Sequence, residues 1–139
     1  MAQGEAVIET DGASRGNPGR AGAGYILSKD GERLAQGSRF LGISTNNVAE
    51  YTGMIMGLEK AVEMGESRVL ALTDSLLVAR QLEGKYRVRK PHLKPLYRRC
   101  MELIGGLESF RVDYVPSSEN RAHALAEEAA GRPPRGKMI

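Results

Sequence analysis

The pattern of apolar and polar positions in the first forty residues predicts three strands. Residues 5–10 are rich in β-branched side chains, and the turn-rich run DGASRGNPG follows them. Two further strand-like stretches, 23–28 and 33–40, flank the sequence KDG at 29–31, which is typical of a hairpin turn. We therefore predict a strand that ends in a glycine loop and continues into an antiparallel three-stranded meander.

The period changes at Thr45, where apolar side chains begin to recur every three or four residues. This spacing predicts an amphipathic helix with Thr45 or Asn46 as its N-cap and Gly65 at its end. A short apolar strand at 68–73 precedes a second helix over 75–84. A strand, helix, strand, helix order implies a parallel crossover connection, which is normally right-handed.

The second half of the chain begins with a basic, irregular stretch at 85–94. The patterns after it predict a helix over 95–104, a strand over 111–115 and an alanine-rich helix over 120–130. The chain has no internal repeat and no linker, so we expect one mixed α/β domain over 1–130. The remaining tail, 131–139, is predicted to be disordered.

Composition adds little to this picture. The chain has 139 residues, of which 41% are hydrophobic and 27% charged, as is usual for a globular domain. Its net charge of +3 slightly favours a polyanionic partner. A single cysteine excludes an intramolecular disulfide and is compatible with a reducing cytosol. Without a signal-peptide pattern or an apolar run of roughly 18 residues, we expect a soluble cytoplasmic protein with no membrane partner.

Three carboxylates lie at positions where functional side chains are often found in α/β proteins. Asp11 follows the first predicted strand, Asp74 follows the strand at 68–73, and Glu50 lies one turn into the first predicted helix. Functional groups of open α/β sheets gather beyond the carboxyl ends of neighbouring strands. If these two strands are parallel neighbours, Asp11 and Asp74 come side by side, and Glu50 can reach them from a helix packed on the sheet.

Three carboxylates in one small site need either raised pKa values or a compensating cation. Hard oxygen ligands select Mg²⁺ or Mn²⁺ over Zn²⁺. Two such ions about 4 Å apart can hold a phosphodiester, activate a water and stabilise the leaving oxygen. Taken singly, however, Asp11 also fits a turn residue and Asp74 a helix N-cap.

The surrounding motifs resemble those of type 1 ribonuclease H. The runs TDGASRGNPG, TNNVAEY and TDSLLV are similar to its three leading motifs, in order and at a familiar spacing, and ENRAHALAEEA resembles the fourth. The resemblance covers residues 5–130 and is strongest to the short bacterial and archaeal forms. It implies a ribonuclease H-like α/β fold, in which a five-stranded mixed sheet, an antiparallel meander plus parallel strands, has helices on both faces.

The resemblance also implies an activity. Members of this family are endonucleases that hydrolyse the RNA strand of RNA–DNA hybrids by two-metal-ion catalysis and leave 3′-hydroxyl and 5′-phosphate ends. They use Mg²⁺ or Mn²⁺, have no organic cofactor and act as monomers. By position, Asp11 would bridge both metal ions, whereas Glu50 and Asp74 would hold the ion on the leaving-group side.

The same resemblance assigns contacts with the nucleic acid. Ser14, Gly16 and Asn17 would meet RNA 2′-hydroxyls, which distinguish RNA from DNA. Asn46 and Asn47 would reach the minor groove of the hybrid, and Thr45 would lie near a phosphate of the DNA strand. Three cations of the basic stretch, Arg87, Arg89 and Lys90, would contact that strand too, although a solvated surface also explains them. Such contacts recognise the shape of the hybrid and read little of its base sequence.

Two features depart from the family pattern. The family usually places an aspartate at the start of the last helix, where this chain has His123 in HALA. His123 then either binds Mn²⁺ directly, holds or activates the water, or leaves a weakened enzyme; imidazole suits Mg²⁺ poorly. Many relatives also carry a histidine in the preceding loop, whereas VPSSEN has none.

These departures leave alternatives open. The first is a catalytically weakened module of the same fold that binds hybrids without cutting them. The second is another nuclease of the fold, such as a transposase or a junction resolvase, although these usually have longer chains without the TNN and GNPG contexts. A domain of a reverse transcriptase is the third.

Overall fold

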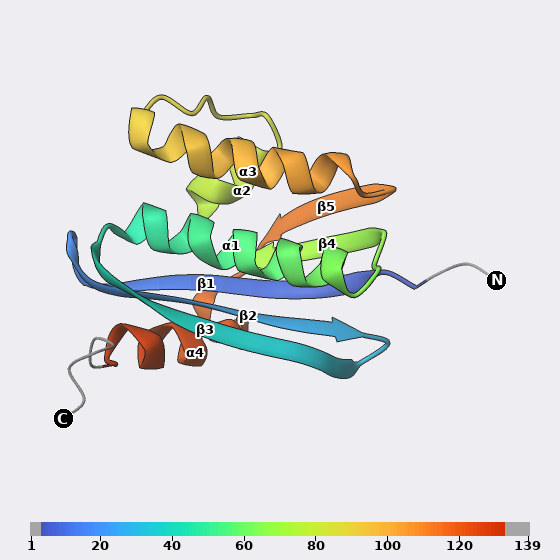
Figure 1. Cartoon of the computed structure of the whole chain (residues 1–139), viewed down its shortest axis with the longest axis horizontal. Coiled ribbons are helices and arrows are strands. Elements are labelled where there is room, and N and C mark those ends of the chain that lie inside the picture. The colour runs from blue at the N-terminus through green and yellow to red at the C-terminus, as the bar shows by residue number, and fades with distance from the viewer. Residues whose placement is uncertain (1–3, 133–139) are drawn as a thin grey trace.

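Five strands form one mixed sheet in the computed structural model, which describes residues 4–132 (Figure 1). They are β1 (Ala6–Gly16), β2 (Gly19–Lys29), β3 (Glu32–Ser44), β4 (Arg68–Thr73) and β5 (Ser109–Tyr114). Their order in the sheet is β3-β2-β1-β4-β5. The first three strands pair antiparallel, whereas β4 pairs parallel with both β1 and β5. The predicted combination of an antiparallel meander and parallel strands is confirmed.

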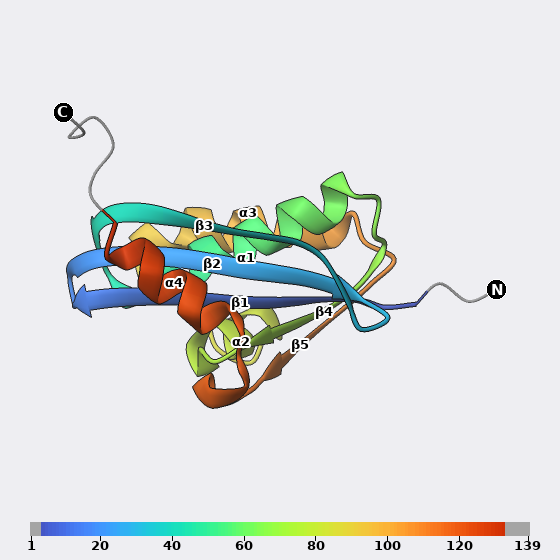
Figure 2. The same cartoon turned by 90° about the horizontal axis from the view of Figure 1, so that it is seen from below.

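The helices cover both faces of this sheet, as predicted. On one face lie α1 (Asn46–Glu63), α2 (Leu76–Leu82) and α3 (Lys94–Gly105), and on the other lies α4 (Ala122–Ala130) (Figures 1 and 2). Two short 3₁₀ turns, η1 (Pro91–Leu93) and η2 (Ser117–Glu119), precede α3 and α4. Within residues 4–132, no helix is long and apolar enough to cross a membrane.

The predicted glycine loop after Asp11 is wrong, because β1 continues through it to Gly16. Every residue from Ala6 to Gly16 pairs with β2, so the backbone groups of DGASRG are satisfied by the antiparallel partner. The chain reverses only at Asn17 and Pro18, after a left-handed φ of +100° at Gly16 that favours glycine. Asp11 therefore lies inside a strand rather than at its end.

Polar side chains accept hydrogen bonds from backbone amides at the starts of the first and the last helix. Of the two N-caps considered for the first helix, Thr45 is the one used, since its hydroxyl accepts from the Val48 amide at 3.3 Å. The last helix begins at Ala122 and not at Asn120, because the Asn120 side chain accepts from the Ala122 amide at 3.0 Å while its own backbone stays extended. Asn120 thus acts as a cap outside the helix.

The two layers of the core differ in the size of their side chains. Large apolar residues such as Ile8, Tyr51 and Leu58 are fully buried between the sheet and α1 to α3. The α4 layer contains small residues, and a Cβ at Gly22 would lie 2.3 Å from the Ala130 amide nitrogen. The α4 helix can therefore pack directly on β2, which brings its side chains close to the middle of β1.

The predicted disordered tail lies outside the described residues from position 133 onward. Its first two residues, Gly131 and Arg132, are described. The Arg132 guanidinium donates to the Ser38 hydroxyl at 2.6 Å and to the Glu128 carboxylate at 3.0 Å.

Candidate active site

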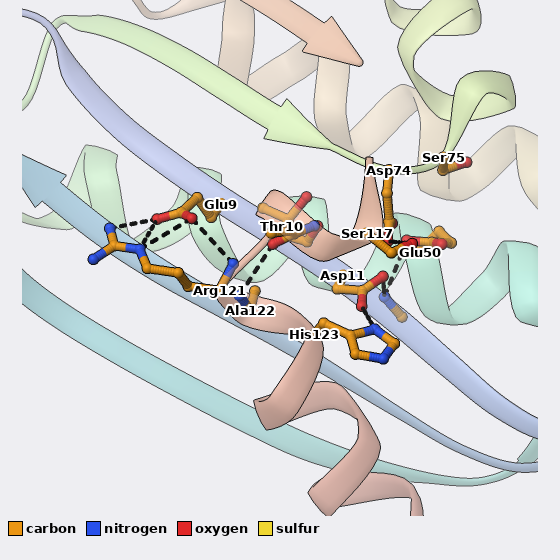
Figure 3. Close-up of polar contacts among 12 residues, drawn as sticks. Glu9, Thr10, Asp11, Glu50, Asp74, Ser75, Ser117, Arg121, Ala122 and His123 are labelled. Carbon is orange, nitrogen blue, oxygen red and sulfur yellow. Dashed lines mark hydrogen bonds and ion pairs between the residues drawn. The ribbon is translucent and has the colours of Figure 1, made fainter. Parts of the chain in front are cut away.

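The register between β1 and β4 brings two of the predicted carboxylates together. The last parallel pair is Thr10 with Thr73, and Asp11 and Asp74 are the next residues on each strand. Because β4 ends there while β1 continues along β2, both carboxylates lie at the edge where the parallel pairing stops (Figure 3). The predicted proximity holds, although Asp11 is not at the end of its strand. Asp11 is buried, and Asp74 is partly exposed.

Glu50 reaches the same place from α1, and a glycine makes this possible. A Cβ at Gly12 would lie 2.2 Å from the carbonyl carbon of Ala49, so only glycine allows α1 to approach β1 so closely. The Gly12 amide donates to Glu50 Oε1 at 3.0 Å and lies 2.9 Å from Asp11 Oδ1. One backbone N–H therefore holds two buried carboxylates next to each other.

His123 enters the site from α4, on the opposite side of β1. Its Nδ1 lies 2.8 Å from Asp11 Oδ2, at hydrogen-bond distance, and about half of the side chain is exposed (49%). One ligand atom from each of Asp11, Asp74 and His123 lies within 4.8 Å of the others. Glu50 lies beside this group, and all four residues line one pocket of about 300 Å³.

Burial and mutual repulsion make this cluster a poor place for uncompensated negative charge. Burial, reinforced by Asp74, raises the pKa of Asp11 to about 7. Burial also raises the pKa of Glu50 well above its usual value, with added repulsion from Asp11 and Asp74. The hydrogen bond with Asp11 raises the pKa of His123. A cation in the pocket would remove these penalties.

The donor atoms fit a divalent cation. Asp74 Oδ2 accepts from the Ser117 hydroxyl at 2.6 Å, but Asp74 Oδ1 is buried and has no hydrogen-bond partner among the described residues. A buried oxygen without a partner costs free energy, which a metal ion would recover. Carboxylate oxygens select hard divalent cations such as Mg²⁺ or Mn²⁺, and the imidazole adds one softer nitrogen ligand to this set.

Two contacts that the sequence did not reveal fix the start of α4 beside this cluster. The Asn120 side chain donates to the Thr10 carbonyl at 2.9 Å. The Arg121 guanidinium donates to both oxygens of Glu9 at 2.5 to 3.1 Å, and its backbone amide also donates to Glu9 at 3.1 Å (Figure 3). Because Glu9 and Thr10 directly precede Asp11, these bonds set where His123 meets the site. Neither contact has a local signal in the sequence, because its partners are 110 and 112 positions apart.

The predicted RNA contacts gather at the end of the β1–β2 hairpin. Asn17 Oδ1 accepts from the Asn46 amide at 3.0 Å, which links the hairpin turn to the start of α1. The Ser14 hydroxyl donates to the carbonyl of Gly16, and both Ser14 and Asn46 line the acidic pocket. Thr45, which was predicted to lie near a phosphate of the DNA strand, and Asn47 are half-buried at the start of α1.

The three cations of the basic stretch, which were also predicted to contact the DNA strand, lie elsewhere. Arg87, Arg89 and Lys90 are exposed on the segment between α2 and η1, on the face of the sheet that α1 to α3 cover. None of them lines the acidic pocket. Gln81 holds this segment, because its side chain donates to the Arg87 carbonyl at 3.3 Å and accepts from the Tyr51 hydroxyl at 2.5 Å.

Comparison with known proteins places the chain in a family. The model of the reverse transcriptase-like family matches residues 9–129. The chain is 40% identical over 126 residues to the bifunctional protein Rv2228c of Mycobacterium tuberculosis, covering 88% of this chain and 35% of that protein. It is 43% identical over 121 residues to ribonuclease HI of Halobacterium salinarum, covering 86% of this chain and 61% of that protein. The chain therefore spans less than two thirds of either relative.

Solved structures give the same grouping. The N-terminal RNase H domain of Rv2228c superposes with a TM-score of 0.90 at 39% identity, covering 92% of this chain and 94% of that chain. The RNase H1 of Halobacterium salinarum gives 0.86 at 41% identity, covering 91% and 97%. LC11-RNase H1, solved in complex with an RNA/DNA hybrid, gives 0.85 at 34% identity, covering 91% and 96%. The fold of this chain and its similarity to these relatives show that the chain belongs to the type 1 ribonuclease H family.

Proposed function

We propose that this protein is an endonuclease that hydrolyses the RNA strand of RNA–DNA hybrids with divalent metal ions and leaves 3′-hydroxyl and 5′-phosphate ends. The observation that carries the proposal is the convergence of Asp11, Glu50, Asp74 and His123 in one pocket. The similarity to LC11-RNase H1, which was solved with an RNA/DNA hybrid, supports this substrate.

The chain's own residues divide the work. Asp11, Glu50 and Asp74 would hold the cations, with Asp11 contributing to both positions and Glu50 and Asp74 to the one on the leaving-group side. Bound cations would orient the phosphodiester, lower the pKa of a water and stabilise the leaving oxygen. The Gly12 amide keeps Glu50 in place, and the Ser117 hydroxyl orients Asp74 so that Oδ1 faces away from it. His123 can hold a metal ion or a water beside Asp11.

Recognition of the hybrid would rest on the hairpin turn and the basic segment. Ser14, Gly16 and Asn17 lie next to the acidic pocket, where RNA 2′-hydroxyls would separate a hybrid from duplex DNA. Asn46 and Asn47 would meet the minor groove, and Thr45 a phosphate of the DNA strand. The three exposed cations of the basic segment, Arg87, Arg89 and Lys90, would add phosphate contacts on that strand.

The finer properties follow from the same residues. We expect the enzyme to work with Mg²⁺ or Mn²⁺, and to prefer Mn²⁺ more strongly than an aspartate at position 123 would, because imidazole is the softer ligand. We also expect a monomer without an organic cofactor, acting in the cytoplasm, where a chain with one buried cysteine needs no disulfide.

A substrate panel tests the proposal. End-labelled RNA–DNA hybrid, double-stranded RNA, single-stranded RNA and duplex DNA are offered with Mg²⁺ or Mn²⁺. We expect cleavage of the RNA strand of the hybrid alone. Asp11→Asn should abolish it, whereas the matched change Asp113→Asn on the exposed surface of β5 should not. If Asp11→Asn cleaved the hybrid as fast as the parent protein does, the pocket would not be the site of cleavage.

One alternative keeps a specific observation in its favour. His123 lowers the negative charge of the site, so a protein that binds hybrids without cutting them is the second candidate. The three acids argue against it. Burying Asp11 and Glu50 without a cation costs free energy, and a protein that only binds hybrids does not need buried carboxylates. Tight hybrid binding with no cleavage in either metal would favour this candidate.

A further inference from the structure

One more carboxylate faces the pocket, and it is neither among the predicted site residues nor used by the proposed mechanism. Glu127 lies one helical turn after His123 on α4 and lines the same pocket as the four site residues. Its side chain is exposed and makes no hydrogen bond or ion pair within residues 4–132. The next residue, Glu128, instead pairs with Arg132 at 3.0 Å and does not line the pocket.

Helix geometry explains why Glu127 and not Glu128 faces the site. Residues four apart lie on the same face of a helix, and side chains tilt towards its N-terminus. Glu127 therefore leans towards His123 and, beyond it, towards Asp11. Glu128, the next residue, instead extends to Arg132, which lies beyond the C-terminal end of α4.

The negative charge of Glu127 would make up for a charge that the site lacks. With His123 at its position, the pocket contains three buried or partly buried carboxylates and one imidazole. A divalent cation on the His123 side would be held by Asp11 and an imidazole alone, with one negative charge fewer than a carboxylate there would give. Glu127 supplies that charge from one turn further along α4.

We propose that Glu127 is the fourth carboxylate of the metal centre, acting on the cation beside His123 through a bound water. The ligand atoms that lie within 4.8 Å of one another belong to Asp11, Asp74 and His123 and do not include Glu127, so one intervening water fits its place better than direct coordination. This inference rests on the proposed metal-dependent function. Glu127 would be a positioning residue, since it reaches the cation through that water.

The size of the effect follows from Coulomb's law. A carboxylate about 6 Å from a divalent cation at a solvent-exposed site should strengthen binding by about tenfold. Glu127→Gln keeps the shape of the side chain and removes only the charge. Glu128→Gln removes the same charge from the same helix and is the matched control. Both positions are exposed, so both variants should fold, which circular dichroism and thermal unfolding verify.

The test measures Mn²⁺ affinity of the protein without substrate, by titration followed by electron paramagnetic resonance. Glu127→Gln should weaken Mn²⁺ binding about tenfold, and Glu128→Gln by less than about twofold. An unchanged affinity in Glu127→Gln, or equal losses in both variants, would overturn the proposal. Because this readout needs no cleavage, it stands apart from the substrate panel, whose failure would leave a metal-binding protein with another activity.

Discussion

The ion pair between Glu9 and Arg121 is predicted to hold the active-site end of α4 on the sheet. Glu9 lies on β1 with 4% of its surface exposed, and three hydrogen bonds from the Arg121 guanidinium reach its two oxygens. Arg121→Met keeps most of the aliphatic stem and removes these bonds. Glu9 then remains buried with only one donor, the backbone amide of residue 121, at 3.1 Å.

The expected loss lies between two limits. Removing one partner of a fully buried pair costs about 3–5 kcal/mol, whereas an exposed pair contributes about 0–1 kcal/mol. Only the glutamate is buried here, because 54% of the Arg121 side chain is exposed. The carboxylate also keeps one hydrogen bond and can draw water into the space left by the guanidinium. We therefore expect the free energy of unfolding to fall by about 1.5–3 kcal/mol.

Urea denaturation of the metal-free protein measures this loss, with Arg99→Met as the matched control. Arg99 pairs with Glu59 at 3.1 Å, but both side chains are nearly half exposed, so its loss should change the free energy of unfolding much less than the loss of Arg121 does. In a Glu9→Gln background, Arg121→Met should cost much less, because no buried charge is left unpaired. If Arg121→Met and Arg99→Met cost the same, burial of Glu9 does not matter and the reasoning is refuted.

Three further predictions concern the site and its approaches. Gly12→Ala should lose about 1–3 kcal/mol of stability in urea denaturation, together with cleavage, because its methyl group would meet Ala49 at 2.2 Å; Gly105→Ala, with nothing within 4 Å, should lose neither, and equal losses would contradict this. His123→Asp should shift the preference in cleavage assays from Mn²⁺ towards Mg²⁺, and an unchanged preference would exclude His123 as a ligand. Neutralising three exposed cations should weaken hybrid binding and flatten its salt dependence in titrations at several salt concentrations, whereas an unchanged slope would identify a merely solvated surface. These cations are Arg87, Arg89 and Lys90.

The acidic cluster could be predicted in part because it depends on rules that a single chain reveals. A short apolar strand followed by an aspartate gave Asp74, and the parallel crossover implied its neighbour Asp11. The change of period at Thr45 placed Glu50 one turn into a helix. Each of these signals spans only a few residues, and the order of the motifs along the chain connected them to one family. The positions of the elements therefore followed from patterns of a few residues each.

The exact course of β1 could not be predicted in the same way. Glycine, serine and asparagine between Gly12 and Gly19 favour turns when considered alone. In the structure, β2 provides a continuous partner for this run, and the small side chains leave space for α1 and α4 to approach. Pairing with a distant strand overrides the local preference. The strand therefore carries Asp11 in its middle, where neighbours on both faces reach it.

The contacts that fix the site depend on residues far apart in sequence. Arg121 and Glu9 are separated by 112 positions, and Ser117 and Asp74 by 43. No periodicity marks such pairs, because they arise only when α4 and the loop before it are placed on the sheet. Glu127 differs, since its spacing of four from His123 was visible in the sequence and becomes meaningful once His123 is placed beside Asp11.

The fold holds the acids in place before any cation arrives, and this has a thermodynamic consequence. The Gly12 amide contacts one oxygen of Asp11 and one of Glu50, and the Ser117 hydroxyl and His123 each hold one further carboxylate oxygen. Burial raises the pKa values of Asp11 and Glu50. Part of the stability gained elsewhere, in the core around Tyr51 and in the Glu9–Arg121 pair, offsets this cost. A cation that binds only the folded protein relieves the repulsion, so metal affinity and folding stability are linked. The close placement that makes uncompensated negative charge costly in this cluster is the same property that would orient a phosphodiester.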